Sequence, residues 1–366
     1  MKKIIISDIT LKKISEDRAV SLLFREKSAI ANCADAIGAD VIEIPAVKSP
    51  REDKIIYKTI AQNIQNAIFS IPVGFNTDDV AIAWDCIKDA KAPRLQVELP
   101  VSTIQMEYTY HVKQAKMLEK IAELIKAAKA LCSDVEFSAL DATRADEDFL
   151  ISAVKEAENC GASMITLCDD AGASTPDDIA KLVSTVKEAV SIPVFVQVSD
   201  RINMAVASAF SAIKCGADGL KCAMVGKNAL LTGEISDAIN ICGAQIDAEI
   251  KLNNTKIHAS IDDMLSSINH DAYESGKTIS DGKKILIDAD STVVQVAQAA
   301  AVLGYELSDS DVGNVYKVIK QICDKKGAVG YKEFEAIIAS SAMQAPSTYH
   351  FETYTTTSSN MSASMS

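Results

Sequence analysis

Aromatic residues, histidines and basic runs are all scarce in this 366-residue sequence. Aromatics make up 5% of the chain, there are four histidines, and 37 Lys and Arg stand against 50 Asp and Glu, for a net charge of −13. A protein that follows a nucleic-acid backbone needs a basic face, and no Lys/Arg-rich run supplies one. We therefore expect no nucleic-acid partner.

Long apolar runs and paired cysteines are also missing. No stretch approaches the roughly 18 apolar residues of a membrane-spanning helix, and the run after Lys2 and Lys3 is too short for a signal peptide. The nine cysteines are scattered singly, without the CxxC pairs that zinc or a redox dithiol would need. These absences predict a cytoplasmic protein with reduced cysteines and no membrane partner.

The first two-thirds of the chain alternates short β-branched runs with amphipathic helical stretches, a pattern typical of repeated β-α units over a parallel sheet. Several of the helical stretches close on a glycine, such as Gly38, Gly161 and Gly216, before the next run. Eight runs predict an α/β fold with a closed (β/α)8 TIM barrel over residues 1–242. The runs are residues 2–8, 39–45, 67–73, 94–100, 134–140, 163–169, 193–199 and 218–224.

The pattern changes after the barrel. Residues 243–291 lose the alternation and are rich in Asn, Asp, Ser and Gly, which predicts an extended linker arm. Residues 292–345 predict a small helical subdomain of two or three helices. Residues 346–366 begin as a Tyr/Thr-rich, strand-like tail and end in Ser and Met, which suggests the start of a truncated C-terminal domain.

Three stretches of the barrel carry recognisable motifs: DITL at residues 8–11, VEFS through DATRAD at 135–146, and MAVA through CGAD at 204–218. They resemble motifs of the α-isopropylmalate, homocitrate and citramalate synthases, which read Asp-Thr-Thr-Leu-Arg-Asp-Gly, Phe-Ser-x-Glu-Asp-Ala-x-Arg-x-Asp and Leu-Ala-Val-Ala-Asn. LGYEL at 303–307 resembles the helical subdomain that follows the barrel in that family. The resemblance implies a metal-dependent TIM-barrel acyltransferase that condenses an acyl-CoA with an α-keto acid, with arms that cross over in a dimer.

The family's metal-binding positions hold other residues here. In the family one aspartate and a His-x-His pair bind a divalent metal that polarises the keto acid's carbonyl group. The aspartate's place is Lys13, and the histidines' places are Gln197 and Ser199. No register shift restores the pair, because no histidine occurs between His111 and His258. We therefore expect no bound cofactor. A divalent metal (Mn²⁺, Mg²⁺ or Zn²⁺) is expected only under the alternative that an altered site still works as an acyltransferase.

Three further functional positions of the family also differ. The arginine that stabilises oxyanion charge is Lys12, the strand-four histidine is Gln105, and the glutamate that completes the site is Leu140. The scaffold motifs remain while the residues that carry the chemistry have changed. The resemblance thus implies a barrel without confident catalytic residues.

Charged residues nevertheless remain at the expected carboxyl ends of the strands, where TIM barrels place their sites. We expect Lys13 to pair with Asp169 or Asp170, and the mouth to face Asp8, Asp141 and Asp169. Lys12 and Lys13 keep positive charge at the mouth, which could hold a small carboxylate ligand. The candidate ligand-binding residues are Asp8, Lys12, Lys13, Glu43, Asp141, Arg144, Asp169 and Asp170.

Three functions remain open from the sequence. The first is a non-catalytic homologue that binds a metabolite, forms a homodimer or pairs with an intact synthase. The second is an acyltransferase that condenses an acyl-CoA with an α-keto acid through an altered site. The third is a metal-free aldolase or lyase that uses a lysine.

Overall fold

The computed structural model describes residues 1–16, 22–268, 287–288, 291–302, 305, 307–326, 328–329, 334 and 337–338. The chain divides into two compact units, residues 1–276 and 277–366. The tail expected over residues 346–366 lies outside the described residues.

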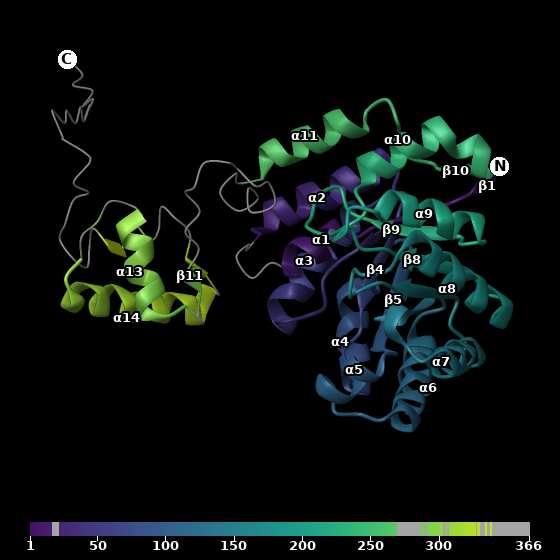
Figure 1. The fold of residues 1–366 in the computed structure, drawn as a ribbon, viewed down its shortest axis with the longest axis horizontal. Helices are drawn as coiled ribbons and strands as arrows, with labels where there is room; N and C mark the ends of the chain where they lie inside the picture. The colour runs from purple at the N-terminus through teal and green to yellow at the C-terminus, as the bar shows by residue number, and fades with distance from the viewer. Residues whose placement is uncertain are drawn as a thin grey trace, which may run out of the picture. The chain divides into compact units, whose positions relative to one another are not determined.

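The first unit is built on a closed barrel of eight parallel strands, as the sequence predicts (Figure 1). Each strand pairs with the next along the chain, and the last pairs with the first, with Ile5 opposite Gly219. The strands are β2 (Ile5–Asp8), β3 (Val41–Glu43), β4 (Ile68–Pro72), β5 (Pro93–Pro100), β6 (Val135–Leu140), β7 (Met164–Cys168), β8 (Val194–Gln197) and β9 (Gly219–Cys222).

Helices surround this barrel. Local signals set their ends: Gly38 adopts φ +93° at the end of α2, and Thr175 caps α8 while Pro176 occupies its first turn. The long helices are α2 (Phe24–Ile37), α3 (Pro50–Asn63), α4 (Thr77–Ile87), α6 (Gln114–Leu131), α7 (Glu147–Asn159), α8 (Pro176–Ala189), α9 (Ala205–Lys214) and α10 (Thr232–Cys242). Three short helices directly follow strands: α1 (Thr10–Glu16), α5 (Thr103–Tyr108) and η1 (Ala142–Arg144).

Apolar side chains fill the layer between barrel and helices, whereas polar ones occupy part of the barrel's interior. Ile30 and Ile37 of α2 and Leu124 of α6 belong to the large buried apolar cluster. Glu43 and Lys221 are charged, yet they too are almost fully buried. Buried charges require partners, so this interior determines how the site is built.

The first part of the expected arm packs on its own barrel. Strand β10 (Ala248–Glu249), after the short helix η2 (Gly243–Ile246), pairs in parallel with β1 (Lys2–Lys3). Helix α11 (Ile257–Ser267) lies against α2, where the Cys33 thiol donates to the Ser260 carbonyl at 3.3 Å. The resemblance implies an arm that crosses over to a second subunit, whereas residues 248–268 pack on their own barrel.

The second unit contains two of the helices that the sequence predicts. Helices α13 (Val293–Val302) and α14 (Asp309–Lys326) share an apolar core, to which Val296, Val315 and Ile319 contribute. Strand β11 (Ile287–Asp288) pairs antiparallel with β12 (Ala328–Val329). Of the third predicted helix, the structure describes three helical residues, at 334, 337 and 338.

Within the described residues, no helix has both the length and the apolar character needed to cross a membrane.

Candidate functional site

A buried ionic network occupies the interior of the barrel. The ammonium group of Lys221, on β9, lies 2.8 Å from Glu43 Oε1 and 2.6 Å from Glu136 Oε1, and all three side chains are at most 1% exposed. Burial by itself would lower the pKa of Lys221, but Glu136 and Glu43 outweigh it and hold the pKa above its usual value. Lys221 is therefore a charged lysine whose ammonium group is held by two buried carboxylates.

Lys12 joins this network from α1. Its ammonium group donates to Glu43 Oε2 at 3.1 Å, to Gln96 Oε1 at 3.2 Å and to Glu98. Burial opposes the charge on Lys12, yet the carboxylates of Glu98 and Glu43 raise its pKa. The side chain that replaces the family arginine thus lies among interior oxygens of β3 and β5.

Hydroxyl and amide groups complete the network. Ser7 Oγ donates to Glu43 Oε1 at 2.6 Å, and Thr166 Oγ1 and Ser138 Oγ donate to Glu136 Oε1 at 2.7 and 2.9 Å. Burial would raise the pKa of Glu43, but the ammonium groups of Lys221 and Lys12 hold it below its usual value. The carboxylates therefore remain ionised inside the barrel.

Sequence reasoning found Lys12 and Glu43 but missed Glu98, Glu136 and Lys221. A signal was present, because each missed residue is charged and lies within an otherwise mainly apolar strand run. A charged residue in such a run is seldom buried without a partner, so each one indicates a buried polar contact.

Asp8 lies on the other side of its strand. Ser7 points into the barrel, so the next side chain points outward, and Asp8 accepts hydrogen bonds from Thr10 N at 3.1 Å and Thr10 Oγ1 at 2.8 Å. Burial raises the pKa of Asp8 to about 7, while its bonds to Thr10 lower the pKa only in part. The expectation that Asp8 faces the mouth is wrong, because strand alternation directs it to the helix layer.

Asp141 and Arg144 form the best-defined polar pair at the strand ends. Asp141 adopts φ +56° directly after β6, a left-handed conformation that Asp tolerates better than most residues. Its buried carboxylate accepts from Ser102 Oγ and from Arg144, whose Nη2 lies 2.6 Å away. This bonding orients the Arg144 guanidinium, and 41% of the Arg144 side chain is still exposed.

Asp169 and Asp170 follow β7 next to that pair. Asp169 Oδ1 accepts from Thr143 Oγ1 at 2.9 Å, Gly172 N at 3.2 Å and Ser174 Oγ at 3.4 Å. Burial raises the pKa of Asp170, and the hydrogen bond from Gln105 Nε2 at 3.3 Å lowers it only in part. The carboxylates of Asp141, Asp169 and Asp170 therefore gather with Arg144, as predicted.

Lys13 does not pair with these aspartates. Its ammonium group lies 3.0 Å from Glu16 Oε2, one turn along α1, so the expected pair with Asp169 or Asp170 is wrong. The i,i+3 spacing on a helix makes Glu16 the nearer partner.

At the three positions that the sequence resemblance assigns to the family's metal ligands, the donor set does not suit a divalent metal. Lys13 presents an ammonium group, Gln197 a neutral amide at the end of β8, and Ser199 a hydroxyl that donates to the Asn228 carbonyl at 3.3 Å. In the part of the chain that the structure describes, no three His, Cys, Asp or Glu residues are arranged to hold a metal ion.

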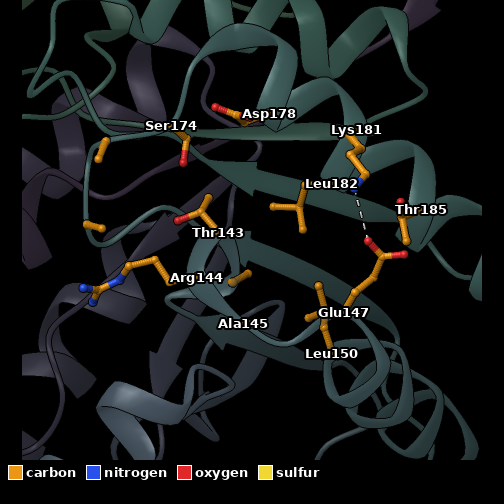
Figure 2. A pocket seen from close by; sticks show the side chains of 13 residues that line it. Thr143, Arg144, Ala145, Glu147, Leu150, Ser174, Asp178, Lys181, Leu182 and Thr185 are labelled. Carbon is orange, nitrogen blue, oxygen red and sulfur yellow. Dashed lines mark ion pairs between the residues drawn. The ribbon is translucent and has the colours of Figure 1, made fainter.

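A separate cavity of about 420 Å³ lies beside this cluster, outside the barrel (Figure 2). Its walls come from η1, the start of α7, the loop after β7, and α8. Thr143 and Ser174, which hold Asp169, line it. The cavity and the strand-end cluster therefore share side chains.

Comparison with known proteins agrees with the resemblance found in the sequence. Residues 3–259 match the family described as HMGL-like. The 2-isopropylmalate synthase of Carboxydothermus hydrogenoformans is 25% identical over 389 residues, which cover 95% of this chain and 76% of that protein. The Bacillus velezensis 2-isopropylmalate synthase is 32% identical over 288 residues, covering 76% of this chain and 55% of that protein.

Solved structures agree on the fold. An HMG-CoA lyase from Bacillus subtilis superposes with a TM-score of 0.62 at 15% identity, covering 73% of this chain and 94% of that one. The Brucella melitensis HMG-CoA lyase gives a TM-score of 0.61 at 14% identity, with coverage of 73% and 99%. The family match spans most of the chain, and this protein belongs to the HMGL-like family.

Proposed function

We propose that this protein is a non-catalytic member of its family that has lost the metal-dependent condensation. One feature of the sequence supports the proposal: the resemblance places Lys13, Gln197 and Ser199 at the positions of the three family metal ligands. A lysine ammonium group cannot ligate a metal, and the amide and hydroxyl are weak neutral ligands. Without the metal, nothing equivalent polarises the keto acid's carbonyl group.

The charge change opposes metal binding even before the ligands are counted. Replacing an aspartate by Lys13 turns a charge of −1 into +1 at the site. At an effective dielectric of about 20, a dication roughly 4 Å from an ammonium group is destabilised by about 8 kcal/mol. The barrel scaffold would then serve binding instead of condensation.

The ligand that we propose is a small carboxylate metabolite. Arg144 supports this choice because Asp141 orients its guanidinium while 41% of the side chain stays exposed. A guanidinium held in this way can donate to a carboxylate at the strand ends.

We also propose that the protein acts as a homodimer or with an intact synthase as its partner. Val293 and Val294 at the start of α13 are 43% and 64% exposed, which leaves apolar surface available on the second unit. Sedimentation alone and with a purified 2-isopropylmalate synthase tests this part. A monomer in both runs at micromolar concentration contradicts it.

Metal analysis of the purified full-length protein tests the loss of the metal centre. We expect no stoichiometric Mn²⁺, Mg²⁺ or Zn²⁺, no change of melting temperature with EDTA, and no thiol release from acetyl-CoA with a panel of α-keto acids. Gln197→His with Ser199→His should not recruit Mn²⁺ unless Lys13→Asp is added. One tightly bound metal per native chain, or thiol release, instead supports the acyltransferase with an altered site.

The lysine-dependent aldolase is less well supported by the site's electrostatics. A Schiff-base lysine must lose its proton, whereas neighbouring glutamates raise the pKa of Lys12 and Lys221. Borohydride treatment with a keto acid should therefore leave the protein's mass unchanged, and a reduced adduct on either lysine would favour the aldolase.

A further inference from the structure

The proposed function uses one lining residue of the cavity between α7 and α8, Arg144, and assigns no role to the rest of the lining. Its volume of about 420 Å³ lies within the range of small-molecule sites, about 300–1,000 Å³. We propose that it binds a small aliphatic monocarboxylate, at a site separate from the barrel's mouth. The inference does not rest on the proposed function.

The base of the cavity is apolar. Leu150 of α7 is 2% exposed, and Leu182 of α8 is partly buried beside it, with small alanines at 145 and 171 in the same lining. Figure 2 shows the Leu182 side chain projecting between those of Thr143 and Lys181. This surface suits a short hydrocarbon body.

Lys181 supplies the charge that selects a carboxylate. Its ammonium group lies 3.4 Å from Glu147 Oε2 in an ion pair whose side chains are 76% and 62% exposed (Figure 2). Such an exposed, long pair is weak, and no hydrogen bond among the described residues holds Lys181. Its N–H groups can therefore turn to a ligand.

The other charged groups of the lining already have fixed partners. Asp178 accepts from Thr175 N at 2.9 Å and Thr175 Oγ1 at 2.7 Å in the cap of α8, and Arg144 is bonded to Asp141. Neither has to rearrange when a ligand reaches Lys181. The ligand's carboxylate would accept from Lys181 while its hydrocarbon body covers Leu182.

A ligand in the cavity would also affect the hydrogen bonds of Asp169 at the strand ends. Thr143 and Ser174 line the cavity while their hydroxyls donate to Asp169 Oδ1 at 2.9 and 3.4 Å. A ligand that reaches Thr143 changes the position of a donor to Asp169. The cavity therefore lies one hydrogen bond from the acidic cluster.

The test is a titration of the full-length protein with sodium isobutyrate, followed by the methyl NMR signals of Leu150 and Leu182. We expect saturable shifts with a millimolar dissociation constant, at least about tenfold weaker binding in Lys181→Gln, and no saturable shift in Leu182→Trp. Ala173→Leu, at an exposed loop position of the lining, gives a second blocked variant if Leu182→Trp does not fold.

Lys155→Gln is the matched control, because Lys155 is an exposed lysine of α7 outside the lining. It removes the same charge and should bind isobutyrate like the native protein. The proposal is overturned if isobutyrate gives no saturable shift, if isobutylammonium binds as tightly, or if Lys155→Gln weakens binding as much as Lys181→Gln.

Discussion

The interior of the barrel and the layer just outside it hold buried carboxyl groups whose pKa values are displaced in opposite directions. Glu43 and Asp8 end neighbouring strands and are 0% and 1% exposed. Glu43 meets two ammonium groups, and its pKa stays below the usual range, whereas burial raises the pKa of Asp8 to about 7. None of the ion pairs among the described residues includes Asp8. Burial alone therefore does not determine the pKa of these carboxyl groups. The direction of the shift depends on whether a buried cation lies beside the group.

The same comparison separates two adjacent lysines of α1. Lys12 reaches interior oxygens, and Lys13 pairs with Glu16 on its own helix. Removing charges from one region and then the other should therefore have very different effects.

The largest expected effect comes from Lys221→Met. It leaves the buried carboxylates of Glu43 and Glu136 without their shared cation, so we expect a loss of about 3–5 kcal/mol in the free energy of unfolding. Urea denaturation measures this. The control Lys54→Met breaks an exposed pair with Asp85 and should cost no more than about 1 kcal/mol.

A companion variant sharpens this result. Adding Glu43→Gln to Lys221→Met removes one of the two carboxylates that lose the Lys221 cation, so part of the lost stability should return. Equal losses in Lys221→Met and Lys54→Met would show that the interior network is not buried as described.

The next effect concerns pH and Asp8. The carboxyl group titrates near 3.9 in an unfolded chain and at about 7 in the fold, so the folded protein binds more protons between these values. The stability that protonated Asp8 contributes is complete below about pH 4 and is lost as the pH rises through about 7. Asp8→Asn, which stays neutral, should remove this loss, on the order of 4 kcal/mol.

Urea unfolding of Asp8→Asn and the native protein from pH 4 to pH 8 measures that difference. The variant should gain stability relative to the native protein as the pH rises. The opposite slope, or parallel curves, would show that Asp8 is ionised throughout.

Lys12→Met should have an intermediate effect. Lys12 and Glu98 are 14% and 21% exposed, so water reaches this end of the network. Water can solvate the carboxylates that lose Lys12, which lowers the cost in stability. We expect a cost of about 1–3 kcal/mol by urea denaturation. A loss as large as that of Lys221→Met would indicate a fully dry mouth.

Lys13→Ala should change stability least. Lys13 is 17% exposed, but its partner Glu16 is 59% exposed, and helical pairs that water reaches contribute about 0.3–0.5 kcal/mol. Thermal unfolding should give nearly the native melting temperature. A large drop would mean that Lys13 has a second partner at the strand ends, as the sequence led us to expect.

The amino-acid sequence determined the architecture of the barrel and its family. Eight β-branched runs and helix-ending glycines such as Gly38 act through local backbone preferences, which do not depend on distant residues. The strand-end cluster of Asp141, Arg144, Asp169 and Asp170 was likewise predictable, because parallel strands of a barrel place their carboxyl ends together.

Only the tertiary structure decided which way the charged side chains face. Strands covered on both sides read as continuous apolar runs, so the sequence does not show that Ser7 points inward and Asp8 outward. The partners of Lys221 lie 178 and 85 positions away at Glu43 and Glu136, and barrel closure brings them together. Charge pairing depends on distance in space, and closure of the barrel sets that distance.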